Sequence, residues 1–490
     1  KILQGKPTLF IAPKLLHIHL WTQFWEFHGR HQLIEELINN VNPELMSWFV
    51  RMFSYAGESR VALEKVKKVL GPNGPFGKHV LAFSKVECRF IYELSNASPE
   101  FTLDCIERVI EQASFEDLHS FHEGRQDIVR ALEVIAVWPR YFERAARMLR
   151  KMALSENSSY ANNSTGVFKE LFSFAPGQMA STGAPPAVRI SVLKETLENN
   201  SPDMRRLGIQ ACKTALSKQA GMRIVGREYQ GLKNAPLWTP ETWGEVFDAI
   251  RSVWELLYDT SRVWDDSIRQ EANHCLVGSA IGLLRVTSLS KQVLETIEFL
   301  IEDEATDLQE LVQGIARIKR YWKDSYEKNV IDRLEEIDLK ITGTSFSDRV
   351  RRIVHLSGLD DYCDENGPDL VMFNKRVAEL ALEASESKTK FQVILPELVR
   401  GTNNAVFQFG FEFAKLDKRK CLEKIYETYR TAEHEATSLL LSGYLAAVFY
   451  EDSQEWEDVV EGLLSDVDFA NLIGPIIRNS GYSDRIILSM

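Results

Sequence analysis

The sequence lacks the signatures of several large classes of protein. Its 490 residues contain no run of about 18 apolar residues, the length that a transmembrane helix needs, so no membrane span is predicted. Acidic residues outnumber basic ones, 70 against 58, and the formal net charge is −12. This balance argues against a broad phosphate-binding surface, which requires an excess of basic residues, although a local basic patch stays compatible with it.

Cysteine is scarce, and its positions are dispersed. No CxxC pair occurs, and neither does the HExxH pattern of zinc hydrolases or the GxSxG pattern of serine hydrolases. Isolated cysteines within helical segments are typical of reduced, buried thiols in a cytoplasmic protein. The cysteines are Cys88, Cys105, Cys212, Cys275, Cys363 and Cys421.

Two loops resemble ligand-binding motifs only superficially. In GPNGPFGKH (71–79), Pro72 replaces the first glycine of a phosphate-binding loop and His79 replaces its hydroxyl residue, so a helix end and a turn are the better interpretation. The acidic loop 358–369 places Phe373 where a calcium-binding loop needs glutamate. We therefore expect no catalytic residue, no cofactor site and no metal site in this chain.

Amphipathic helical segments fill most of the sequence. Many begin with a capping residue or with proline, which is favoured at the first helical position because its missing N–H is not needed there. Such starts lie at Pro43, Pro99, Pro139 and Pro202. Successive segments form helical hairpins, with pairs at 187–216, 264–301 and 369–399. The pattern predicts an all-α fold, an irregular HEAT- or armadillo-like helical repeat array that forms an α-solenoid.

Breaks in this pattern divide the chain into four predicted segments. A short β-like run at Thr8–Ile11 precedes an aromatic helix, which resembles the end of a winged-helix module. Because residues 1–13 read as the end of a module, we expect the chain to be a piece of a longer protein. The segment 451–468 carries eight acids without Lys or Arg and predicts a solvated helix face. The four segments are 1–30 (module end and linker helix), 31–218 (first half of the array), 219–245 (inserted loop) and 246–490 (second half).

The inserted loop stands out in GREYQGLKNAPLWTPETWGEVF, residues 226–247. It combines glycines and prolines with Trp238 and Trp243, each of which can bury a large area. Arg227 and Glu228 are charged residues that a partner could contact. Two interpretations stay open: the loop is a plug with both tryptophans in the core, or it is a docking site for a partner.

Two basic clusters, 316–323 (ARIKRYWK) and 348–355 (DRVRRIVH), mix cations with apolar residues. They are candidates for contact with a partner or with nucleic acid, which such patches bind by charge and stacking. The competing interpretation is a solvated helix face, because Ile315, Ile318 and Trp322 form one helical stripe. The candidate residues are Lys319, Arg320, Arg351 and Arg352.

Three stretches carry a family resemblance. They are LFIAPKLLHIHLWTQFWEF (9–27), WPRYFERAARMLRKMALSENSSYANNSTGVFKELF (138–172) and VGREYQGLKNAPLWTPETWGEVF (225–247). Together they resemble the helical region that follows the ATPase and winged-helix modules of bacterial STAND-type NTPases, many of which act in anti-phage defence. The resemblance covers about half of the chain and includes no catalytic signature, because neither a Walker A nor a Walker B motif occurs in it.

The resemblance implies a sensor region in the cytoplasm that binds a protein trigger, with phage proteins as the candidates. After binding, the full-length protein would form a homo-oligomer. ATP and Mg²⁺ would bind only in a module upstream of Lys1. Alternatives from other classes stay open. They are a stand-alone helical scaffold, a nucleic-acid-binding helical array and an enzyme whose site is assembled across helices.

Overall fold

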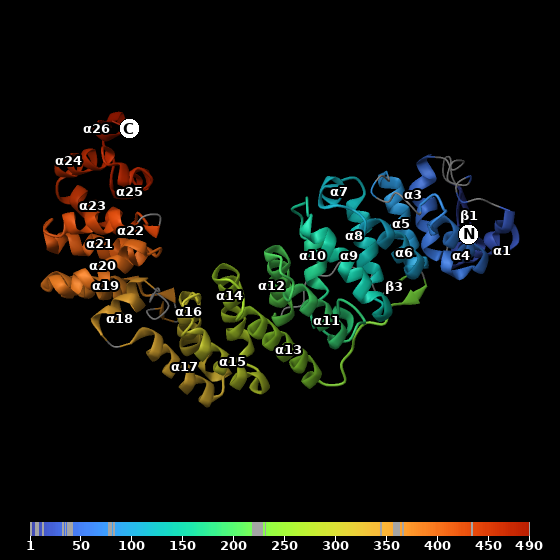
Figure 1. Ribbon diagram of the computed structural model, residues 1–490, viewed down its shortest axis with the longest axis horizontal. Helices are drawn as coiled ribbons and strands as arrows, with labels where there is room; N and C mark the ends of the chain where they lie inside the picture. The colour runs from blue at the N-terminus through green and yellow to red at the C-terminus, as the bar shows by residue number, and fades with distance from the viewer. Residues whose placement is uncertain are drawn as a thin grey trace. The chain divides into compact units, whose positions relative to one another are not determined.

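The computed structural model describes most of the chain and divides it into two compact units. Unit 1 is Lys1–Gly282 and unit 2 is Leu283–Met490. Helix accounts for 77% of the structure, against about a third in an average soluble protein, so the fold is all-α as predicted (Figure 1). The described residues are 2–4, 9–11, 14–31, 34, 36, 43–76, 81, 84–217, 229–230, 232–343, 345–355, 363–364, 367–432 and 435–489.

Strands within the described residues form only short antiparallel hairpins. The first confirms the β-like run near the N-terminus and leads into an aromatic helix, α1. The four-segment division, the winged-helix likeness and the solenoid form stay predictions. The pairs are β1 (Ile2–Gln4) with β2 (Leu9–Ile11), β3 (Tyr229–Gln230) with β4 (Lys233–Asn234), and β5 (Cys363–Asp364) with β6 (Gly367–Pro368).

Unit 1 is a stack in which each helix packs against near neighbours in the sequence. Helix α5 packs on α8, α8 on α9, α9 on α10 and α11, and α12 on α13. Its helices are α1 (Lys14–His28), α3 (Pro43–Met52), α4 (Arg60–Leu70), α5 (Lys85–Ala97), α6 (Pro99–Ile110), α7 (Phe115–Ser120), α8 (Arg125–Ile135), α9 (Phe142–Leu154), α10 (Ser164–Glu170), α11 (Pro186–Leu197), α12 (Pro202–Leu216), α13 (Trp243–Ser261) and α14 (Asp266–Leu283), the last residue of which belongs to unit 2.

Local sequence explains how these helices begin and meet. Proline occupies the first turn of α3, α6 and α12, as predicted, and also that of α11. Pro139 is an exception, because it opens a 3-10 turn (Pro139–Tyr141) and the α-helix starts only at Phe142. The predicted hairpin 187–216 is confirmed as α11 and α12. A Cβ at Gly208 of α12 would lie 2.7 Å from Cδ2 of Leu197, so a residue without a side chain lets the two helices approach.

Unit 2 arranges its later helices in two rows. Helix α21 packs between α19 and α23, which in turn packs on α25, while α20 packs on α22 and α24 packs on α26 (Figure 1). The helices are α15 (Thr287–Leu300), α16 (Gln309–Arg317), α17 (Lys328–Thr342), α18 (Phe346–Val350), α19 (Leu370–Glu386), α20 (Lys388–Arg400), α21 (Asn404–Asp417), α22 (Leu422–Ala432), α23 (Leu439–Glu451), α24 (Ser453–Leu464), α25 (Ile473–Ser480) and α26 (Asp484–Ser489).

The contact between α21 and α23 depends on glycine on both helices. A Cβ at Gly410 would lie 2.4 Å from the carbonyl oxygen of Leu440, and one at Gly443 would lie 2.0 Å from that of Phe407. Helix α23 is apolar almost all round, which fits its position inside this core. Among the helices that the structure describes, none is both long enough and apolar enough to span a bilayer.

Candidate functional site

Trp238, one of the two tryptophans of the inserted loop, is buried in unit 1 with 9% of its surface exposed. Its ring lies 5.1 Å from the guanidinium of Arg189 and meets Phe174 edge-on, with 6.3 Å between ring centroids. Arg189 is fully buried, and its Nε and Nη1 donate to the carbonyl oxygens of Ala184 and Ser173, each at 2.7 Å. A buried cation is therefore held between aromatic rings and backbone carbonyls.

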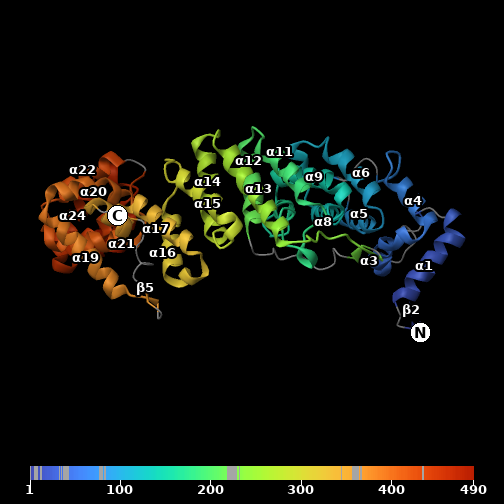
Figure 2. The ribbon, with the colours of Figure 1, turned by 90° about the horizontal axis from the view of Figure 1, so that it is seen from below.

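The backbone around Trp238 is joined to the earlier loop 173–186. The Trp238 N–H donates to the carbonyl oxygen of Thr182 at 3.0 Å, and the Gly183 N–H donates to that of Val137 at 2.8 Å. A Cβ at Gly183 would lie 1.7 Å from the carbonyl oxygen of Pro236, so only glycine fits there. In both views, the chain that leads into α13 runs along the helices of unit 1 (Figure 1, Figure 2). This arrangement favours the plug interpretation for Trp238.

Trp243 has the opposite environment, although the plug interpretation placed both tryptophans in the core. It is the first residue of α13, and 65% of its surface is exposed. Its ring stacks on Phe247 one turn later, with centroids 6.2 Å apart and planes inclined by 23°. The other candidates in this loop, Arg227 and Glu228, lie outside the described residues.

The two basic clusters coincide with the π-helical turns Ile318–Trp322 and Arg351–His355 of unit 2. Each turn places one cation beside the same carboxylate on α17. Lys319 Nζ and Arg352 Nη1 each lie 3.1 Å from Oδ2 of Asp338, which is 3% exposed. The structure thus brings two of the predicted site residues together around a partner that lies between them in the sequence. Such π-helical turns are rare and often mark functional positions.

Of the other two candidate cations in these clusters, Arg351 has a described partner and Arg320 does not have a described side chain. Arg351 forms an ion pair with Glu397 of α20, and this hydrogen bond raises the pKa of the Arg351 guanidinium. The backbone of Arg320 belongs to the first π-helical turn, but its side chain lies outside the described residues. Local carboxylates compete with phosphate for the paired cations, so binding of nucleic acid stays a prediction that the geometry does not favour.

The acidic segment 451–468 is more than the solvated face that was predicted. Three arginines from other helices and turns share its carboxylates, and Asp452 instead caps α24. The carboxylates therefore bind neighbouring elements together. Arg419 pairs with Glu451 and Glu455, Arg430 with Asp466 and Asp468, and Arg485 with Glu457, Asp458 and Glu461.

Arg419 reaches its partners from a strained turn. Lys418 and Arg419 both have positive φ angles, 49° and 68°, a conformation that costs a non-glycine residue about 1–2 kcal/mol. Buried Asp417 holds the turn, since its Oδ2 accepts from the Tyr444 hydroxyl at 2.6 Å and from the Cys421 N–H at 2.9 Å. This turn places the Arg419 guanidinium within ion-pair distance of α23 and α24.

The described cysteines that lie in predicted helices are buried, as the sequence predicts. Cys88, Cys105, Cys212 and Cys275 are buried, and Cys421 is partly buried. Burial raises the pKa of Cys88 to about 12 and that of Cys105 to about 11, so both thiols stay protonated near neutral pH. Within the part of the chain that the structure describes, no group of three His, Cys, Asp or Glu side chains is placed to hold a metal ion.

Two residues that organise these sites were missed in the sequence, although each carries a signal. Arg189 precedes buried Val192 and Leu193 by three and four positions, and Asp338 follows buried Leu334 by four. Both charges therefore lie in register with an apolar helical stripe. A charge at such a position predicts a buried residue with a dedicated partner, but it does not identify the partner.

Comparison with protein-family models and with curated proteins identifies no relative of this chain. No protein-family model matches the chain, and no curated protein matches it. The resemblance to the helical region of STAND-type NTPases therefore rests on the three sequence stretches alone.

Proposed function

We propose that this chain is a non-catalytic, protein-binding helical scaffold, with Trp243 at the centre of its contact surface. The observation that carries the proposal is the exposed ring of Trp243, because tryptophan is enriched among the residues that dominate protein interfaces. Trp238 anchors the loop just before it. The exposed ring is thus presented by a fixed backbone, which lowers the entropy lost on binding.

The finer proposal is that the chain is the sensor part of a larger STAND-type ATPase in bacterial immunity. A phage protein would bind the scaffold with higher affinity in an open state, shift the resting protein toward that state and allow homo-oligomers to form. ATP and Mg²⁺ would belong to an upstream module. The support is the resemblance of 9–27, 138–172 and 225–247, together with an all-α array that follows a short hairpin.

Site-specific crosslinking tests the protein-binding proposal. Trp243 is replaced by the photoreactive residue benzoylphenylalanine in cells that are then infected with phage. Val263, which is 86% exposed just beyond the other end of α13, is the matched control position. We expect one defined phage protein to crosslink from position 243 and not from position 263. Equal crosslinking from both positions, or none to any phage protein, would contradict the proposal.

Binding measurements with the purified partner then separate recognition from folding. Trp243→Ala should weaken binding by roughly 30-fold, the loss of about 2 kcal/mol that defines a strong interface residue. Its melting temperature should stay that of the unmodified protein, since an exposed ring contributes little to stability. Val263→Ala should change neither quantity. The coding DNA upstream of Lys1 tests the ATPase part separately, because a start codon directly before it would leave only the scaffold.

A further inference from the structure

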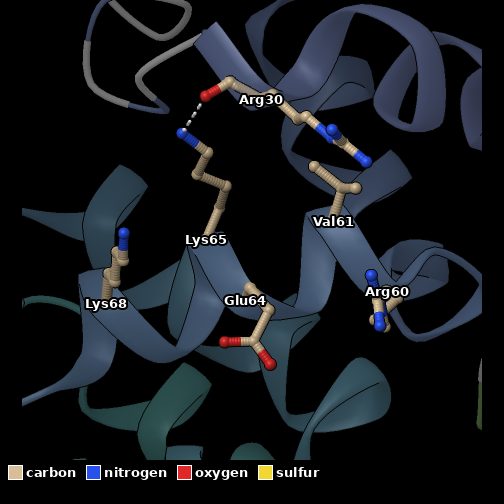
Figure 3. Close-up of a pocket in the computed structure, with 6 residues that line it drawn as sticks. All are labelled: Arg30, Arg60, Val61, Glu64, Lys65 and Lys68. Atoms are coloured by element: carbon tan, nitrogen blue, oxygen red, sulfur yellow. Dashed lines mark hydrogen bonds between the residues drawn. The ribbon is translucent and has the colours of Figure 1, made fainter.

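A basic cavity lies where η1 (Gly29–His31) meets α4 in unit 1. Its volume is about 350 Å³. Residues on one face of α4 line most of it, and the turn after α1 supplies one more residue (Figure 3). The lining residues are Arg30, Arg60, Val61, Glu64, Lys65 and Lys68. The cavity is far in sequence from Trp243 and is independent of the protein-binding proposal.

The charges around this cavity do not balance. The lining holds four cations and one carboxylate, that of Glu64, which is directed away from Arg30 in Figure 3 and accepts from Lys67 Nζ at 3.4 Å. A second carboxylate, that of Glu26, lies near Arg60 outside the lining. None of the four cations forms a salt bridge, within 4.0 Å, to a carboxylate of the described residues. Several other cations of unit 1 are paired, as Arg147 is with Glu195 at 2.6 Å. The cavity is therefore a local positive site in a protein of net charge −12.

Neighbouring contacts hold the site in shape. Lys65 Nζ donates to the backbone carbonyl oxygen of Arg30 at 3.0 Å, which ties the turn to α4 (Figure 3). The N-terminus of α4 is already capped, because Ser59 accepts from the Ala62 N–H and donates to Glu26 Oε1 at 2.5 Å. The Ser59 hydroxyl, with backbone N–H groups of α4 and the nearby charge of Arg60, lowers the pKa of Glu26. The site therefore offers side-chain cations rather than free helix-end N–H groups.

We infer that this cavity binds a small, soluble anion that carries two or three linked phosphate groups. Arg30 and Arg60 supply planar guanidinium forks, which match phosphate oxygens two at a time, and Lys65 and Lys68 add point charges. The volume is at the lower end of the range for small-molecule sites and fits one compact ligand. An extended nucleic acid needs a broad basic surface, which the net charge of −12 does not favour, so a compact anion is favoured.

Calorimetric titration of the full chain with inorganic tripolyphosphate tests this inference. We expect Arg60→Ala and Lys68→Ala each to weaken binding roughly tenfold, a typical effect for one charged hydrogen-bonding group. The double variant Arg30→Ala/Arg60→Ala should show no measurable binding. Arg60→Lys should fall between Arg60→Ala and the unmodified protein. The matched control is Lys213→Ala, an exposed lysine of α12 in the same unit, which should bind as the unmodified protein does.

Two further probes identify the source of the phosphate groups. A single-stranded oligonucleotide and phosphatidylcholine vesicles that contain a phosphoinositide are titrated under the same conditions. We expect neither to bind more tightly than tripolyphosphate. Tighter binding of either probe, lost in the Arg30→Ala/Arg60→Ala variant, would overturn the assignment to a small soluble ligand. Absence of tripolyphosphate binding, or binding that the cavity variants leave unchanged, would overturn the site itself. Circular dichroism of each variant checks that unit 1 is folded.

Discussion

Trp238→Ala is the sharpest test of how the inserted loop works. The substitution removes a ring that is 9% exposed and packs against Phe174 and Arg189. Truncating a buried tryptophan to alanine costs about 3–5 kcal/mol through lost transfer free energy and the cavity left behind. Fully buried Arg189 also loses one of its two aromatic contacts, and a desolvated cation–π contact contributes up to about 2 kcal/mol.

We therefore expect Trp238→Ala to lower the free energy of unfolding by about 4–6 kcal/mol. For a domain of this size, each kcal/mol corresponds to about 2–4 °C in melting temperature, so the transition of unit 1 should fall by roughly 10 °C or more. Scanning calorimetry measures this shift, and far-UV circular dichroism in urea gives the free energy. Trp243→Ala in the same loop is the control. It should change the free energy by about 0.5 kcal/mol or less, because that ring is exposed.

The reasoning would be refuted by two results. One is a loss of under about 1 kcal/mol in Trp238→Ala, which would mean that the ring does not anchor the loop. The other is an equal loss in both variants, which would mean that Trp243 is also part of the core. If Trp238→Ala instead abolished partner binding at an unchanged melting temperature, the docking interpretation would hold for Trp238 as well.

Three other predictions concern buried polar groups. Asp338→Asn should lower the free energy of unfolding by about 2 kcal/mol in urea titrations, because two partly screened cations lose their shared charge partner. Tyr444→Phe should cost about 1–3 kcal/mol, because buried Asp417 loses a donor, whereas Tyr450→Phe, at 86% exposure, should be neutral. The pKa of Cys88 is raised in the folded state, so its contribution to stability is complete below the ordinary thiol pKa and is lost as the pH rises toward about 12. The melting temperature should thus fall less steeply above pH 9 in Cys88→Ala; an identical slope would contradict this.

Local sequence was enough to predict the all-α fold and many helix starts, because capping and proline preferences act within a few residues. It was not enough to distinguish Trp238 from Trp243. The two tryptophans share the same loop composition, and only contact with Phe174 and Arg189, which lie far back in the sequence, decides which one is buried. The start at Pro139 was misplaced because proline at a first turn is compatible with both an α-helix and a 3-10 turn.

The charged segments also show that local sequence does not predict contacts with distant residues. An acidic run without basic residues predicts a solvated face, and several of its carboxylates are exposed, but it does not predict the ion pairs that Arg419 and Arg485 form with it. The basic clusters were recognised, whereas their shared partner Asp338 was not, since nothing local relates a residue on α17 to π-helical turns on either side of it. Ion pairs between helices depend on how the helices pack against each other. The periodicity of a single helix predicts only which residues share one of its faces.

The joined loops of unit 1 also bear on how this array unfolds. A stack whose helices contact only their sequence neighbours behaves as a one-dimensional chain, and it can fray from one end while the rest stays folded. Here the Trp238 N–H donates a hydrogen bond to the carbonyl oxygen of Thr182. The next residue, Gly183, donates its N–H to the carbonyl oxygen of Val137. The segment that enters α13 is therefore held to the end of α8, across several intervening helices. These long-range ties couple distant repeats, and the segment between them should melt as one cooperative block rather than helix by helix.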